Sequence, residues 1–204
     1  TAQSLEALFY HIPGLRVVMP STPYDAKGLL THSLRQDHPV MFLEHKHLYM
    51  TKGMVPEEDY EIEFGKAEVM TEGDDVTIVA WSHMLLKAME AAETLAAENI
   101  RAEVINLRTL SPLDADTIMT SVAKTNRVVI AQEAVRRGGV ASDIASYIHQ
   151  KEFYSLDAPI EIVAGLNIPI PFNLNLEKAS VPQAKDIVDA CLLYTSPSPR
   201  DRSS

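Results

Sequence analysis

Short apolar runs alternate with amphipathic segments along most of this 204-residue chain. The apolar runs are rich in Val, Ile and Ala, which is typical of strands buried on both faces. The segments between them span about 10–16 residues and repeat their apolar positions every three or four residues, which predicts helices. The alternation predicts an α/β fold in which helices cover both faces of a mostly parallel sheet. Expected strands are residues 76–80, 102–107, 127–131 and 160–164, and expected helices are residues 83–98, 114–124, 138–150 and 182–190.

The first fifty or so residues predict a strand–helix–strand unit of their own. A short helix is expected over residues 4–11, and strands over residues 17–19 and 40–43. Thr22 and Pro23 are typical of a helix start, since a hydroxyl can cap the helix and Pro fits its first turn. The apolar face expected for that helix consists of Ala26, Leu29, Leu30 and Leu34.

The composition changes at residues 52–63, where Gly53, Pro56 and three consecutive acids are typical of a surface linker. We therefore expect a boundary there, with one unit over residues 1–51 and a second over residues 64–190. At the start of the second unit, residues 65–69 are a candidate edge strand, and Ser82 is expected to cap the helix that follows residue 81.

Charge and composition exclude several classes of protein. The formal net charge is −10, which argues against nucleic acid as a partner because phosphates require clustered Lys and Arg. No apolar run reaches the ~18–20 residues that cross a membrane. The single cysteine cannot form an internal disulfide, which favours a reducing compartment and a cytoplasmic enzyme. The glycine-rich fingerprints of dinucleotide and phosphate loops do not occur.

Two segments carry side chains that could bind a ligand. His45 and His47 lie two residues apart after an expected strand, so they could hold a metal ion if a third ligand joined them, or they could serve a surface or interface role. Glu133, Arg136, Arg137, Gly138 and Gly139 follow a strand and precede a helix. That position could hold an anion at the carboxyl end of the sheet, or it could be a turn with solvated arginines that contact a partner.

Three further segments have no chemistry of their own. The stretch Ile168-Pro-Ile-Pro-Phe172 is apolar and rigid, which suits a packing loop or an interface. The chain opens at Thr1 directly into a helical pattern, so we expect that it was cut from something longer. Residues 191–204, which include Cys191, resemble a translated sequencing adapter, and we expect them to be a non-native tail rather than a natural Ser/Pro-rich one.

Several stretches taken together resemble one family. The most extensive is IPGLRVVMPSTPYDAKGLL at residues 12–30, followed by PVMFLE at residues 39–44 and LRTLSPLD at residues 107–114. Further agreement lies at residues 4–7, 124–129, 169–172 and 181–187. In this order and spacing they resemble the β subunit of the thiamine-diphosphate-dependent decarboxylating component of 2-oxoacid dehydrogenase complexes, a family with pyruvate, branched-chain and acetoin members.

The resemblance implies an architecture and a chemistry. It implies the end of a pyrimidine-binding α/β domain followed by a three-layer α/β domain of the transketolase C-terminal type. In the family, thiamine diphosphate with Mg supports decarboxylation of a 2-oxoacid, and the cofactor is activated by a Glu that would precede Thr1. A family His falls at or just before Thr1, so no catalytic residue is assigned in this chain. A fragment of a transketolase or of a deoxyxylulose-phosphate synthase, or a non-catalytic assembly module, remains an alternative.

The resemblance also implies partners and a second ion. An α subunit would complete an α2β2 heterotetramer, and the dihydrolipoyl acyltransferase core would receive the product. In relatives a basic subunit-binding domain of that core meets an acid that matches Asp157. A potassium ion is held in relatives largely by main-chain oxygens, at positions that match Ser33, Leu34, Gln36 and His38.

Overall fold

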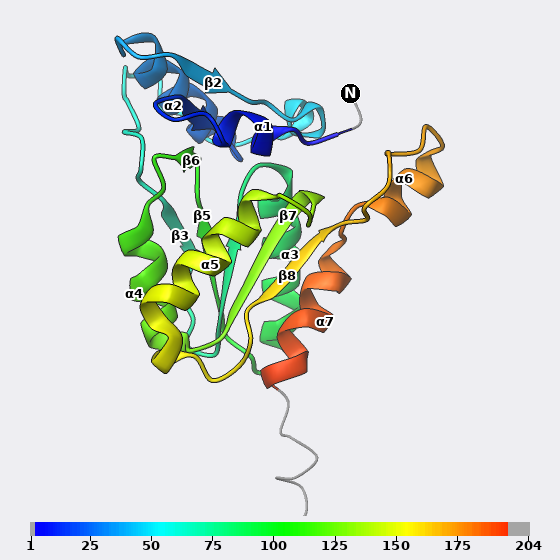
Figure 1. The fold of residues 1–204 in the computed structure, drawn as a ribbon. Coiled ribbons are helices and arrows are strands. Elements are labelled where there is room, and N and C mark those ends of the chain that lie inside the picture. Colours follow the sequence, from blue (N-terminus) through cyan, green and yellow to red (C-terminus); the bar gives the residue numbers. More distant parts are fainter. Residues whose placement is uncertain (1–2, 196–204) are drawn as a thin grey trace, which may run out of the picture.

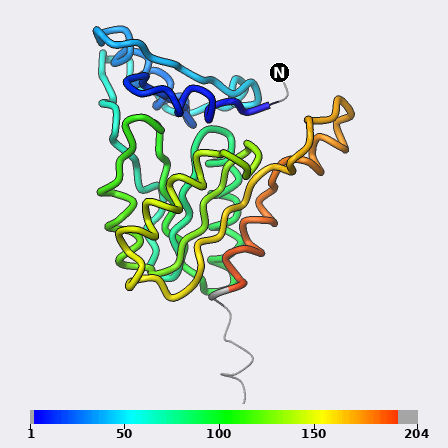
Figure 2. The backbone as a smooth tube through the Cα atoms, in the orientation of Figure 1, coloured from blue at the N-terminus to red at the C-terminus, as the bar shows by residue number. Residues whose placement is uncertain are grey.

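The computed structural model describes residues 3–195, and it consists of a small N-terminal unit resting on one end of a larger α/β unit (Figure 1). The backbone trace in Figure 2 shows the same arrangement, with the N-terminal segments crossing one end of the larger unit. The N-terminal unit contains α1 (Glu6–Tyr10), β1 (Arg16–Val18), α2 (Pro23–Leu34), β2 (Val40–Phe42) and the 3-10 helix η1 (Lys46–Met50). β1 and β2 pair in parallel across α2, which confirms the expected strand–helix–strand unit.

The larger unit is built on a five-stranded sheet of order β3-β5-β4-β7-β8. Its strands are β3 (Glu68–Thr71), β4 (Val76–Ala80), β5 (Ala102–Asn106), β7 (Val128–Val135) and β8 (Glu161–Gly165). All pairs are parallel except β3, which runs antiparallel to β5 at one edge. The central strands β4 and β5 are buried along their whole length. The mostly parallel sheet predicted from the apolar runs is thereby confirmed.

Helices cover both faces of this sheet and form a core on each side (Figure 1). α3 (His83–Ala97) and α7 (Ala184–Thr195) pack on one face, around Leu85, Leu95 and Ile187. α4 (Ala115–Thr125) and α5 (Val140–Glu152) pack on the other, around Ile118 and Ile144. The 3-10 helix η2 (Phe153–Ser155) follows α5, and α6 (Leu174–Ser180) lies on the connection between β8 and α7. No helix of the described residues is both long and apolar enough to cross a bilayer.

A short strand from the larger unit belongs to the sheet of the smaller one. β6 (Thr109–Ser111) pairs antiparallel with β1, so the small sheet has the order β2-β1-β6. The chain turns into β6 at Arg108, whose φ of 60° lies in the left-handed region. The sequence pattern does not predict this strand, because three residues between a strand and a helix are too few to show a period.

The buried face of α2 differs from the expected one. Leu30 and Leu34 are exposed, whereas Asp25, Gly28 and Leu29 are buried. Gly28 is required because a Cβ there would lie 2.6 Å from the Ile62 side chain, so the end of the expected linker packs directly on the helix backbone and is not a surface segment at Ile62. The apolar period did not predict the buried face of α2, because two of its inward positions are not apolar side chains. Asp25 makes a polar contact there, and Gly28 allows another segment to pack against the helix backbone.

The last helix continues beyond the point where its pattern was expected to stop. α7 runs to Thr195, and Cys191 is buried in the core beside Ile187. Burial raises the pKa of the Cys191 thiol to about 12. Residues 191–195 therefore extend the helix, and the remainder of the expected tail, residues 196–204, lies outside the described residues.

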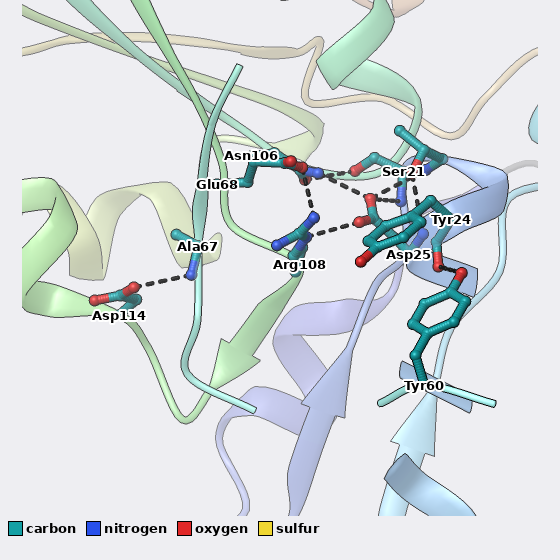
Figure 3. Close-up of polar contacts among 10 residues, drawn as sticks. Ser21, Tyr24, Asp25, Tyr60, Ala67, Glu68, Asn106, Arg108 and Asp114 are labelled. Carbon is teal, nitrogen blue, oxygen red and sulfur yellow. Dashed lines mark hydrogen bonds and ion pairs between the residues drawn. The ribbon is translucent and has the colours of Figure 1, made fainter. Parts of the chain in front are cut away.

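A buried ion pair joins the two units (Figure 3). Asp25, at the third position of α2, is fully buried and accepts a hydrogen bond from Arg108 Nε at 2.7 Å. Its other carboxylate oxygen accepts from Asn106 Nδ2 at 2.8 Å and from the Thr22 backbone N–H at 3.2 Å. Arg108 also bridges to Glu68 of β3 at 2.5 Å. The start of α2 is therefore anchored to the ends of β5 and β3.

We predict that Arg108→Met lowers the free energy of unfolding by about 3–5 kcal/mol, because it leaves the Asp25 carboxylate buried without its charged partner. Arg101→Met is the matched control, since Arg101 pairs with Asp74 at the exposed surface and such pairs contribute about 0–1 kcal/mol. Urea unfolding followed by far-UV circular dichroism measures both. Equal losses in the two variants would contradict the prediction.

Candidate functional site

A cavity of about 560 Å³ lies where the two units meet. The N-terminal unit contributes α1 and residues 43–47 to its wall. The larger unit contributes the start of α3, Glu133 of β7, and residues of α6 and the turn that follows it. The cavity therefore opens at the carboxyl ends of β4 and β7, the edge at which open α/β sheets bind ligands.

Three potential ligand side chains converge in this cavity: His45, His83 and Glu133, hereafter the His–His–Glu cluster. His45 Nε2 lies 2.9 Å from Glu133 Oε2, and His83 Nδ1 lies 3.4 Å from the same oxygen. The two imidazole rings are stacked, with centroids 4.7 Å apart and an interplanar angle of 12°. All three residues are partly buried.

The fold explains why these residues meet. β4 and β7 are parallel neighbours, with Ala80 opposite Ala131, so His83 and Glu133 emerge side by side just beyond the paired residues. His45 follows β2 and precedes η1, and its side chain reaches across the junction between the units. The cluster thus takes one residue from the small unit and two from the large one.

The carboxyl of Glu133 is held in its ionised form. Burial alone would raise its pKa, but hydrogen bonds from His45 and His83, together with their positive charge when protonated, outweigh burial and lower the pKa to about 2. Glu133 is therefore an anion at every pH at which the protein is expected to work.

The hydrogen bonds also assign the tautomer of His45. The His47 backbone N–H donates to His45 Nδ1 at 3.2 Å, which caps η1. Since Nδ1 accepts a hydrogen bond, the ring proton of neutral His45 resides on Nε2, which donates to Glu133.

Ser82, the residue before His83, is strained. Its φ of 52° is unusual for a residue other than glycine, and its hydroxyl makes no capping hydrogen bond to α3. The expected Ser82 cap is therefore wrong. The Ser82 side chain lines the cavity wall and is 4% exposed, and its Oγ has no hydrogen-bond partner within residues 3–195. A buried hydroxyl without a partner costs free energy of folding. Strained backbone conformations such as that of Ser82 are found most often at functional sites.

The two histidines singled out from sequence do not act as a pair on a strand. β2 ends at Phe42, and His45 and His47 lie around the start of η1. Their ring centroids are 5.2 Å apart and nearly perpendicular, and His47 is exposed. The third group that a metal would need is supplied near His45 by the larger unit.

The candidate anion segment is divided by the fold. Glu133 faces the cavity, whereas Arg136 and Arg137 are exposed on the turn between β7 and α5. Arg137 donates to Asn167 at 3.2 Å. Gly138 has a φ of 65°, and a Cβ at Gly139 would lie 2.2 Å from the Gln132 side chain.

Gln132 explains why Gly139 must lack a side chain. The Gln132 side-chain oxygen accepts from the Ala141 N–H at the start of α5, and its nitrogen donates to two carbonyls of the strand end. One of the helix amides that an anion would need is therefore already bonded within the chain.

The residues matched to a potassium site lie at the end of α2. The Ser33 hydroxyl donates to Leu29 O at 2.7 Å, and the Gln36 side chain folds back onto His32. Leu34 and His38 are exposed, with His38 just before β2. The Ser33 main-chain oxygen accepts a hydrogen bond from the Gln36 N–H at 3.3 Å.

Asp157 lies near the amino ends of β7 and β8, whereas the cavity lies at the carboxyl ends of β4 and β7. It follows η2, its carboxylate lies 3.3 Å from Arg127 Nη2, and about half of its side-chain surface is exposed. The apolar stretch from Ile168 to Phe172 is largely exposed and leads into α6, which projects away from the sheet (Figure 1).

Glu6, Ser82 and His83 of the cavity wall were not identified as site residues from sequence. The sequence did contain a signal for His83, which follows a buried strand by three residues. Glu133 lies at a similar position after the buried residues of the neighbouring strand. Because the two strands are parallel, both side chains lie at the carboxyl end of the sheet. No comparable signal marks Glu6. Its side chain is fully buried and accepts a hydrogen bond at 3.4 Å from the indole N–H of Trp81, which lies 75 positions later in the sequence.

We predict that Glu133→Gln removes a pH-dependent part of the stability. A depressed pKa stabilises the fold above the unfolded value of about 4.5, and this contribution of about 3 kcal/mol is lost as the pH falls towards 2. The difference in unfolding free energy between the native chain and the variant should therefore shrink between pH 4.5 and pH 2. Urea unfolding at a series of pH values measures it.

Glu93→Gln is the control, because Glu93 is exposed on α3. Its stability difference from the native chain should not change with pH. Parallel pH profiles for the native chain and Glu133→Gln would contradict the prediction.

Comparison with known proteins agrees with the fold. Residues 65–187 match the family described as transketolase, C-terminal domain, and residues 1–52 match the transketolase pyrimidine binding domain. A split gene transketolase, described as an inactive beta4 tetramer, superposes with a TM-score of 0.77 at 27% identity, covering 94% of this chain and 60% of that one.

Curated relatives confirm the resemblance inferred from sequence. The chain is 49% identical over 189 residues to the acetoin:2,6-dichlorophenolindophenol oxidoreductase subunit beta of Cupriavidus necator, covering 93% of this chain and 56% of the relative. It is 47% identical to the pyruvate dehydrogenase E1 component subunit beta of Rickettsia felis and 45% identical to that of Bacillus subtilis, covering 93% and 92% of this chain and 58% of each relative.

The chain thus spans 56–58% of the length of these relatives. Over that span, the order of strands and helices, the two matched regions and the sequence identities agree. The chain therefore belongs to the transketolase C-terminal domain family, and its sequence is similar to the β subunits of pyruvate and acetoin dehydrogenases.

Proposed function

We propose that this chain is part of the β subunit of a 2-oxoacid dehydrogenase decarboxylating component. The reaction is the oxidative decarboxylation of a 2-oxoacid, with transfer of the acyl group to lipoyl groups of an acyltransferase core. The observation that carries the proposal is the identity of 45–49% to such subunits over about 189 residues, which runs through both units of the fold.

The described residues do not themselves fit thiamine diphosphate. The cavity between the units is lined by three histidines, by the acids Glu6, Glu44, Glu133 and Glu177, and by the lysines Lys46, Lys87 and Lys178. The four acids outnumber the three lysines, so the lining has no excess of positive charge for a diphosphate, and Mg²⁺ prefers oxygen ligands to imidazoles. We therefore propose that the cofactor and its Mg are bound outside residues 3–195, by an α subunit and other parts of the pyrimidine-binding domain.

An α subunit is accordingly the first partner that we propose, in an α2β2 assembly. The similar split gene transketolase supports this, since its beta4 tetramer is described as inactive. The structural likeness also leaves a transketolase-type reaction as a second candidate. The sequence identity of 27% to that protein, against 49% to the acetoin enzyme, favours the dehydrogenase. A potassium ion held by carbonyls near Ser33, Leu34, Gln36 and His38 is part of the same proposal.

We predict that the 204-residue chain alone does not decarboxylate 2-oxoacids, because none of its described residues forms a cradle for the cofactor. The complete β subunit from the same genome, co-expressed with its α subunit, should reduce 2,6-dichlorophenolindophenol when thiamine diphosphate, Mg²⁺ and substrate are supplied. Pyruvate, acetoin and branched-chain oxoacids should be tested in parallel, since the identities of 49% and 47% do not separate two of these classes.

Two outcomes would contradict this. Turnover by the isolated chain would show that the cofactor site lies within it. Transfer of a ketol group between sugars by the co-expressed pair, without 2-oxoacid decarboxylation, would favour the transketolase candidate.

We also propose that the acidic larger unit docks a basic domain of the acyltransferase core through Asp157. The net charge of −10 favours a basic partner, and half of the Asp157 side chain stays exposed beside Arg127. A partner cation would share this carboxylate with Arg127.

We predict that Asp157→Asn, in the assembled α/β complex, weakens binding of the acyltransferase subunit-binding domain by about threefold to tenfold and flattens its salt dependence. Asp189→Asn is the matched control, since Asp189 is an exposed acid paired with Lys185 on α7. Surface plasmon resonance at several salt concentrations measures both. Equal effects of the two variants would contradict a specific role for Asp157.

A further inference from the structure

We propose that the His–His–Glu cluster, formed by His45, His83 and Glu133, binds a divalent transition-metal ion of the zinc type. Nothing in the proposed 2-oxoacid chemistry requires this ion. The proposal depends on the arrangement of the cluster and stands whether or not the dehydrogenase function is correct.

The donor atoms lie close enough to share a single ion once the stacked imidazole rings of His45 and His83 rotate to direct a nitrogen lone pair at it. The three ligand atoms lie within 4.8 Å of one another. Two of the separations are 2.9 and 3.4 Å. Ligands at ~2.0–2.1 Å from a tetrahedral Zn²⁺ are separated by roughly 3.3 Å, so both nitrogen–carboxylate distances are already close to the required value.

The chemistry of the donors selects the class of ion. Two imidazoles and one carboxylate are the ligand set of many zinc sites that keep an open position. Mg²⁺ and Ca²⁺ are disfavoured because they prefer oxygen ligands. The Glu133 carboxyl is already ionised at neutral pH, so binding displaces no proton from it.

The cavity leaves room for the remaining coordination position. Ser82 lies on its wall beside His83, and its buried hydroxyl has no partner in the described part of the chain. A water molecule on the metal would provide one. This buried hydroxyl without a partner is a second, independent indication that the site accommodates a ligand.

Binding has a structural consequence at η1. The metal would take the lone pair of His45 Nε2, so the ring proton must shift to Nδ1. Nδ1 then no longer accepts from the His47 N–H, and the cap of η1 is lost. Metal binding should therefore loosen residues Lys46–Met50.

The test is a titration of the purified chain with Zn²⁺ at pH 7.5 by isothermal calorimetry. Ni²⁺ quenching of Trp81, the single tryptophan, provides an optical readout, since Trp81 lies two residues before His83. We expect one site of micromolar or tighter affinity. His83→Asn and Glu133→Gln should each weaken it by roughly tenfold or more, because each removes one ligand.

His47→Asn and His149→Asn are the matched controls: His47 is close to the cluster but outside it, and His149 is exposed on α5. Each should change the affinity by less than about threefold. Circular dichroism of the metal-free variants checks folding, and His83→Asn carries the test if Glu133→Gln does not fold. Hydrogen exchange with and without Zn²⁺ should show loss of protection at residues 46–50.

Two results would overturn the proposal. One is an affinity weaker than about 1 mM for the native chain, which would leave the cluster as a hydrogen-bonded contact between the units. The other is loss of binding in His47→Asn with binding retained in His83→Asn, which would place the ion on the two histidines around η1 instead.

Discussion

The contact between Asp25 and Arg108 determines how the two units are placed. Asp25 lies in the first turn of α2, where a carboxylate both completes the cap with Thr22 and benefits from the positive end of the helix. Its full burial is tolerable because Arg108, Asn106 and main-chain N–H groups satisfy the carboxylate oxygens. Arg108 adopts a left-handed backbone and leads directly into β6, so the same residue that neutralises Asp25 also starts the strand that extends the small sheet.

The cavity is a product of that junction. The small unit contributes α1, η1 and the residues between β2 and η1 to the cavity wall. The large unit contributes the carboxyl ends of β4 and β7. Because His45 crosses to Glu133, the His–His–Glu cluster exists only while the units keep this placement. A ligand that tightens the cluster therefore stabilises the docked arrangement, and any partner that shifts the small unit changes the affinity for that ligand.

Periodicity predicted the layers of the fold but not the contacts between its two units. Buried strands such as Val76–Ala80 are visible in sequence because both of their faces require apolar residues. The inward face of α2 was mispredicted because Asp25 and Gly28, a charged residue and one without a side chain, occupy it. The link from His45 to Glu133 spans 88 residues and follows no repeat, so only the folded chain shows it. The family resemblance indicated the chemistry of the relatives but not this cluster.

The pairing of β6 with β1 also affects the order in which the chain can fold. Val17 of β1 lies opposite Ser111, 94 positions later in the chain (111 minus 17). At a synthesis rate of about 5–20 residues per second, β1 leaves the ribosome roughly 5–20 s before its second neighbour does. Contacts so distant in sequence close slowly, and until then one edge of β1 stays open to other strands. The small unit is therefore expected to mature only after the chain has been made as far as Ser111, about two-fifths of the way through the large unit.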